Sequence, residues 1–120
     1  MVLRNVAEGA RFGEGEFGGI HFRTVERSAE APWLTLIMGY SGSSDSWGPR
    51  FIGTLASESN LLLIDNRGTG RSVRSPDTSG FSVPLFADDT VSVIEHLGIS
   101  TTVAGLSLGG CIAQEIVNRR

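Results

Sequence analysis

Lysine is absent from the sequence, so all ten of its basic residues are arginines. Without lysine, Schiff-base chemistry is excluded, and so is a phosphate-binding loop that relies on its lysine. Cysteine is nearly absent too. Cys111 stands alone, and by itself it can form neither an internal disulfide nor a zinc site. This cysteine usage favours a reducing compartment.

Long apolar runs are missing as well. The longest ones, residues 61–64 and 36–38, fall far short of the roughly 20 residues that a membrane-spanning helix needs. The first eight residues lack the apolar core of a secretory signal. We therefore expect a cytoplasmic protein without a membrane partner.

An excess of positive charge is also lacking, because the formal net charge is −3. A nucleic-acid partner held by electrostatics is therefore not expected. With 40% hydrophobic and 19% charged residues, the composition is that of an ordinary globular protein. A chain of 120 residues suffices for one small domain, so residues 1–120 are assigned to a single domain.

Apolar segments alternate with helical patterns along most of the chain. Strands are expected at Ile20–Glu26, which alternates, and at the apolar runs 33–38, 61–64 and 101–104. Helices are expected from Pro49, over residues 82–97 between a Ser82 cap and Gly98, and over residues 108–120. This order predicts an α/β fold with a mostly parallel sheet and flanking helices. Before Ile20 the pattern is too weak for an assignment.

The most informative motif is Gly-Leu-Ser-Leu-Gly at residues 105–109, which matches G-x-S-x-G between an expected strand and an expected helix. A turn this tight strains the backbone of Ser107, and Gly105 and Gly109 are needed because side chains there would collide with the strand and the helix. The hydroxyl of Ser107 is thereby exposed at the start of a helix, where developing negative charge is favoured.

Three segments, in this order, resemble the N-terminal part of the α/β-hydrolase fold family across essentially the whole chain. Residues 36–41 look like the loop after the family's third strand, with Met38 where histidine is commoner. Residues 65–72 look like the D-x-R-G-x-G-x-S loop after the fourth strand. Residues 105–115 resemble the serine turn and following helix of the esterase and lactonase branches.

The resemblance implies that Ser107 is a nucleophile and that the backbone N–H groups of Leu108 and Tyr40 form the oxyanion hole, supported by the glycines Gly39, Gly105 and Gly109. It implies hydrolysis of a small carboxylic ester or lactone through an acyl-enzyme, with no cofactor and no metal. The loop of residues 65–72 is expected to be structural, with Arg67 holding neighbouring backbone.

In this family the catalytic acid and histidine follow the nucleophile along the chain. The 13 residues after Ser107 contain no histidine, no aspartate and a single glutamate, Glu115. His96 is expected about 20 Å from Ser107, at the other end of a strand, and His21 on an early strand away from it. We expect both to be surface or packing residues. As an isolated chain, this front half of the fold should be at most a very weak hydrolase.

The strand from Thr101 to Leu106 would form an unprotected apolar edge of the sheet, which favours pairing with another chain. A homo-oligomer, a domain swap or a complementing C-terminal segment would cover it. The alternative to an enzyme is therefore a non-catalytic truncated scaffold that acts as a binding or oligomerisation module.

Other motifs carry less. Residues 13–18 match G-x-G-x-x-G but follow no expected strand. Gly68 and Gly70 do follow an expected strand, but Val73 occupies the position of the third glycine. A nucleotide-binding domain is therefore a weaker third interpretation. Asp88 and Asp89 point in different directions on a helix, so they are better explained by a favourable interaction with its positive end than by a metal site. Cys111 is expected to be a small buried residue.

Overall fold

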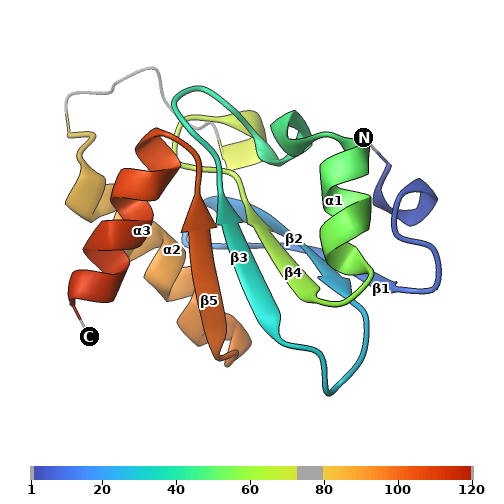
Figure 1. The fold of residues 1–120 in the computed structure, drawn as a ribbon. Coiled ribbons are helices and arrows are strands. Elements are labelled where there is room, and N and C mark those ends of the chain that lie inside the picture. The colour runs from blue at the N-terminus through green and yellow to red at the C-terminus, as the bar shows by residue number, and fades with distance from the viewer. Residues whose placement is uncertain (1, 73–79, 120) are drawn as a thin grey trace.

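The computed structural model describes residues 2–72 and 80–119 (Figure 1). The strands are β1 (Arg11–Phe17), β2 (Ile20–Glu26), β3 (Trp33–Ile37), β4 (Asn60–Ile64) and β5 (Thr101–Gly105). The helices are α1 (Pro49–Ala56), α2 (Val83–Leu97) and α3 (Leu108–Asn118), with short 3-10 turns η1 (Leu3–Asn5), η2 (Ser44–Trp47) and η3 (Gly70–Ser72). Val73 and Arg120, which entered the sequence predictions, lie outside the described residues. The expected α/β class is confirmed.

The five strands form one mixed sheet in the order β1-β2-β4-β3-β5. Strand β3 pairs in parallel with β4 and β5, whereas β2 pairs antiparallel with β1 and β4. The parallel arrangement expected from the sequence therefore holds for β4, β3 and β5, and the N-terminal hairpin adds the antiparallel part. Because parallel strands end at one edge, the segments that follow β3, β4 and β5 meet there.

Strand β1 was not predicted, because its glycines and glutamates have low strand propensity. Its glycines serve the pairing with β2. A Cβ on Gly13 would lie 2.5 Å from Oγ1 of Thr24, and one on Gly15 would lie 2.7 Å from the ring of Phe22. The G-x-G-x-x-G match of residues 13–18 thus belongs to a β-hairpin.

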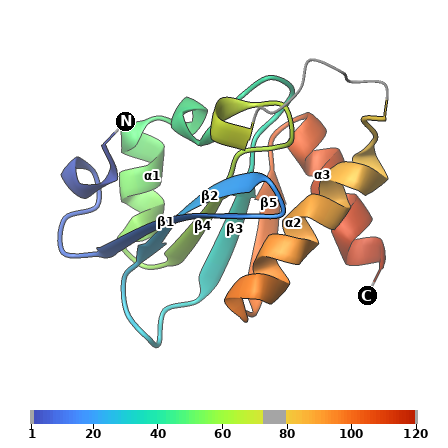
Figure 2. The same cartoon turned by 180° about the vertical axis from the view of Figure 1, so that it is seen from behind.

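Helices cover both faces of the sheet, with α1 on one face and α2 and α3 together on the other (Figures 1 and 2). Strand β4 is buried along its whole length. Leu61 and Leu63 pack towards α1, and Leu62 and Ile64 pack towards α2. The continuous apolar run predicted such a strand, buried on both faces.

Helix α2 has the boundaries that its capping residues predict. The Ser82 side chain accepts a hydrogen bond of 3.2 Å from the N–H of Leu85, and Gly98 ends the helix in the left-handed conformation. Asp88 and Asp89 point to different partners, Arg119 and Arg67, rather than to a shared cation.

The prediction that Cys111 is buried was wrong, because its side chain is exposed. Helix α3 buries Gly109, Ile112, Ala113 and Ile116, which share one face at helical spacing. Cys111 lies off that face.

Strand β5 stands at the end of the strand order, and within residues 2–72 and 80–119 no strand pairs with its outer side. Three of its five residues are half-buried and two, Thr102 and Gly105, are exposed. The expected sheet edge is therefore present in the described structure. No helix within this part of the chain has the length and apolarity needed to cross a bilayer.

We predict that Leu62→Ala lowers the free energy of unfolding by about 2–5 kcal/mol, because it removes a fully buried side chain from the central strand. Chemical denaturation followed by circular dichroism measures this. Val117→Ala, at an exposed position on α3, serves as control and should change stability by no more than about 0.5 kcal/mol. Equal losses in both variants would contradict a core centred on β4.

Candidate active site

Ser107 lies in a strained turn between β5 and α3. Its φ of 58° and ψ of −116° are unusual for a residue with a side chain. A Cβ on Gly105 would lie 2.0 Å from the backbone of Gly109, and a Cβ on Gly109 would lie 1.9 Å from the carbonyl oxygen of Ile37. Both positions therefore require glycine, as the G-x-S-x-G pattern predicts.

The strained turn leaves the Ser107 side chain exposed at the beginning of α3. Its carbonyl oxygen accepts hydrogen bonds from the N–H groups of Gly110 and Cys111, at 2.9 and 3.3 Å, so its backbone is tied into the first turn. Its hydroxyl makes no capping hydrogen bond to that helix. The hydroxyl is therefore available to a molecule approaching the carboxyl edge of the sheet.

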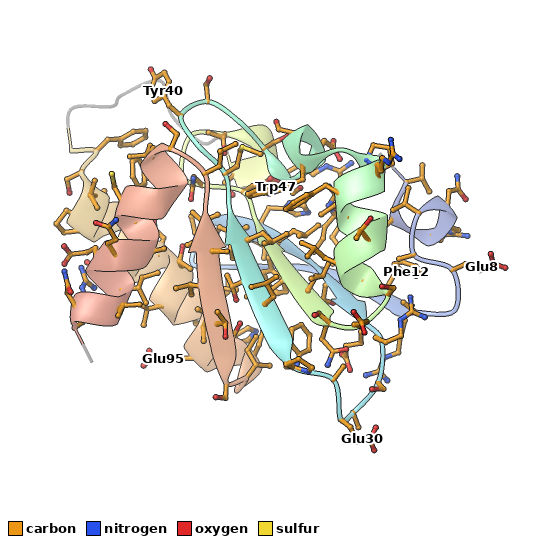
Figure 3. The ribbon with its side chains drawn as sticks, in the orientation of Figure 1. Glu8, Phe12, Glu30, Tyr40, Trp47 and Glu95 are labelled. Carbon is orange, nitrogen blue, oxygen red and sulfur yellow. The ribbon has the colours of Figure 1, made fainter. Side chains whose placement is uncertain are left out.

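The loop after β3 lies directly against this turn. A Cβ on Gly39 would lie 2.9 Å from the carbonyl oxygen of Leu106 and 3.3 Å from Cβ of Ser107. The N–H of Leu106 donates to the carbonyl of Ile37 at 3.1 Å, which fastens the two segments together. Tyr40, the residue after Gly39, has a side chain that is 85% exposed and stands above the sheet (Figure 3). The structure thus brings together the segments of every residue that the sequence nominated.

A cavity of about 400 Å³ lies beside Gly39 and Leu108, and its lining is mainly apolar. The rings of Phe81 and Phe86 meet edge to face there, with centroids 5.4 Å apart. These aromatic residues were not predicted as part of the site. They flank the start of α2. The sequence feature that could have indicated them is a helix that begins between two aromatic residues, directly after a polar segment.

Arg67 also lines the cavity, but its charge is already paired. Its guanidinium donates to both carboxylate oxygens of Asp89 on α2, at 3.0 and 2.8 Å. The hydrogen bond to Asp89 raises the pKa of Arg67 above its usual value. Arg67 therefore ties the loop after β4 to α2 through a side chain, whereas we expected it to hold backbone.

His21 is a buried packing residue. Its Nδ1 lies 2.8 Å from Oδ2 of Asp65 and its Nε2 lies 2.5 Å from Oε2 of Glu14. Arg71 also pairs with Glu14, at 2.9 Å. The hydrogen bond from His21 is the main reason why the pKa of Glu14 is lowered, and burial opposes it. The expected packing role fits, but the sequence did not reveal the two carboxylate partners.

Neither histidine is placed to activate Ser107. His21 lies on β2 near the carboxyl end of β4, where its carbonyl accepts a hydrogen bond from the N–H of Asp65. In the strand order, β2 is three strand spacings from β5, which is about 14 Å. His96 lies near the end of α2 and stacks on Phe17 with centroids 4.2 Å apart. Within the described part of the chain, the exposed Ser107 therefore has no neighbouring imidazole.

The class of protein is defined by a mixed sheet with helices on both faces, a strained serine after β5 and a glycine loop that lies against it. The sequence profile of the α/β-hydrolase fold matches residues 32–119, and the chain belongs to this family.

Among its relatives is a protein assigned as carbamate hydrolase RutD in Agrobacterium fabrum, 34% identical over 103 residues. This match covers 84% of the chain and 39% of the relative. The bifunctional esterase/perhydrolase DCH of Acinetobacter calcoaceticus is 34% identical over 82 residues, which cover 68% of the chain and 29% of that enzyme.

Solved structures with a similar fold agree with this family assignment. A protein assigned as a lipase in Acinetobacter baumannii superimposes with a TM-score of 0.78 at 31% identity, over 97% of this chain and 39% of that one. A variant of the N-acyl homoserine lactonase AidH gives a TM-score of 0.74 at 28% identity, over 92% and 41%. The chain spans about two fifths of the length of these two structures.

We predict that Gly109→Ala strongly destabilises the protein, by about 3 kcal/mol or more, because the added methyl group would collide with the carbonyl of Ile37. The matched control is Gly110→Ala. A Cβ there would find its nearest neighbour at 3.5 Å, and alanine favours a helix, so stability should be unchanged or slightly raised. Thermal unfolding of both variants tests this. Two equally stable proteins would show that the turn is looser than described.

Proposed function

We propose that Ser107 is the nucleophile of a serine hydrolase that acts on a small carboxylic ester or lactone. The Ser107 oxygen adds to the carbonyl carbon, and the proton of its hydroxyl passes to the oxygen of the ester bond that breaks, which becomes an alcohol. Water then adds to the acyl-enzyme, releases the acid and returns a proton to the Ser107 oxygen. The observation that carries this proposal is the strained, exposed Ser107 between two glycines that cannot be replaced.

The oxyanion formed in this addition would be bound by the backbone N–H groups of Leu108 and Tyr40. Leu108 is the first residue of α3, where the N–H groups of a helix are free and its dipole favours negative charge. Gly39 allows the loop carrying Tyr40 to approach Ser107 closely. Two fixed donors at one point are the arrangement that stabilises a tetrahedral intermediate.

The cavity lined by Gly39 and Leu108, the neighbours of the serine turn, favours an uncharged and partly apolar substrate. Among the described residues that line it, the one cation is Arg67, and that side chain is already paired with Asp89 rather than free for a substrate carboxylate. Relatives carry names that include esterase, lactonase, lipase and carbamate hydrolase. Esters, lactones and carbamates all present a carbonyl carbon to a nucleophile.

Full activity would require a histidine beside Ser107, oriented by an acid. Neither His21 nor His96 reaches Ser107, and Glu115 is engaged by Arg119. An oxyanion hole and binding alone leave a small residual rate. We therefore infer that this chain by itself acylates slowly.

The prediction is that a fluorophosphonate probe labels the purified chain slowly and at one site, detected as a single mass increase of the intact protein. Ser107→Ala should take no label. Ser92→Ala, which alters an exposed serine on α2, should label as the unaltered protein does. A folded chain that takes no label would refute the acyl-enzyme proposal for these residues and favour the alternative below.

The alternative function is a non-catalytic binding or oligomerisation module, and the open strand β5 favours it. An apolar groove of about 420 Å³, with Trp47, Phe51 and Leu106 in its lining, lies on the α1 face beside β5. Another of about 450 Å³ lies between β5 and α3, where Val103 and Val117 contribute. The described residues that line these two grooves include no charged side chain. We propose a second copy of the chain as the occupant of this edge.

If a second copy pairs with β5, light scattering after size-exclusion chromatography should give twice the mass of one chain. Thr102→Lys places a charge on the open strand and should shift the protein towards the monomer, because charges on edge strands oppose pairing. Monomers in both samples would rule out the second copy and leave the edge to a complementing C-terminal segment.

A further inference from the structure

Two adjacent residues that follow β4 hold both ends of the loop after β3. The amide Nδ2 of Asn66 donates to the carbonyl of Met38 at 2.9 Å, and Oδ1 of Asp65 accepts from the N–H of Ser44 at 2.6 Å. Both side chains are buried, with Asp65 2% and Asn66 4% exposed. Residues 38–44, called the oxyanion loop below, are thus fastened to the neighbouring strand.

The contact of Asn66 lies close to the proposed oxyanion donor. The Met38 carbonyl and the Gly39 N–H belong to one planar peptide unit, so Asn66 fixes the orientation of that plane. The next peptide unit carries the N–H of Tyr40. Between the two units stand only the torsions of Gly39, the residue type with the widest conformational freedom. An external restraint at Met38 therefore limits where the Tyr40 N–H can point.

Asn66 is itself held in place. Its carbonyl accepts from the N–H of Thr69 at 2.9 Å and from Oγ1 of Thr69 at 2.7 Å. It also lies two residues after the fully buried strand β4. Precise donor geometry requires support from rigid neighbours, and Asn66 has that support on both sides.

We propose that Asn66 is a positioning residue, which sets the direction of the Tyr40 N–H through its hydrogen bond to Met38. This inference rests on the proposed function, in which that N–H binds the oxyanion. The D-N-R-G-T-G-R-S segment, which the sequence indicated as structural, would then contribute to catalysis through Asn66.

The chain offers a matched control in Asn60, at the other end of β4. Asn60 is 1% exposed, and its amide donates to the carbonyls of Ser28 and Ala31 at 2.9 and 3.0 Å. It is the same residue type, placed at the start of β4 where Asn66 follows its end, and it makes the same kind of contact to backbone carbonyls. It holds the loop before β3, at the edge of the sheet away from Ser107.

The experiment compares Asn66→Asp and Asn60→Asp in the full chain. Asn66→Asp replaces the donor by an oxygen that repels the Met38 carbonyl, and we expect the backbone amide resonances of Gly39 and Tyr40 to shift or broaden. The maximal rate of fluorophosphonate labelling should fall about 10- to 100-fold with little change in the probe's half-saturating concentration. Asn60→Asp should leave both the resonances and the rate unchanged, although it lowers the melting temperature.

Unchanged Tyr40 and Gly39 resonances in Asn66→Asp would overturn the proposal, and so would an equal loss of labelling rate in both variants. If Asn66→Asp does not fold, Asn66→Ala removes the same donor without a repelling charge and is judged by the same readouts. If the unaltered chain takes no label, the proposed function fails, and the Tyr40 resonance alone still decides whether Asn66 orients the loop.

Discussion

The contact on which the site depends is that between the backbones of β3, β5 and α3. The carbonyl of Ile37 lies so close to Gly109, and Gly109 so close to Gly105, that no side chain fits at either glycine. This approach forces the turn at Ser107 into a positive φ and brings the Gly39 loop against it. A steric condition at two positions thereby determines where Ser107 and the Gly39 loop lie relative to each other.

The rest of the fold supports this contact from the side. Strand β4 is buried on both faces, and the three residues that follow its carboxyl end contact three different parts of the fold. Asn66 binds the loop after β3, Asp65 binds His21 and Ser44, and Arg67 binds α2. The loop after β4 therefore links the hairpin, the sheet and a covering helix. A change in any of these would alter the cavity that Asn66 and Arg67 line.

Much of this could be predicted from the sequence, because strong local patterns determined it. Continuous apolar runs identified β3 and β4, Ser82 and Gly98 marked the ends of α2, and the spacing of glycines around Ser107 predicted the turn. Strand β1 was not predicted, because its residues have weak strand propensity and form a strand through their pairing with β2. The contacts of His21, Arg67 and Asn66 join residues far apart in the chain, and no periodicity records such pairs. Cys111 is exposed because α3 buries a different face of the helix. The sequence pattern of so short a helix did not determine which face that would be.

That exposed cysteine gives the molecule an experimental handle. Cys111 is the sole thiol of a chain without lysine, and it lies one helical turn after Ser107. Its N–H donates to the Ser107 carbonyl, so the two residues share the first turn of α3. A maleimide fluorophore or spin label would attach at this position alone, and its signal would report on local motion next to the serine turn without any engineered substitution.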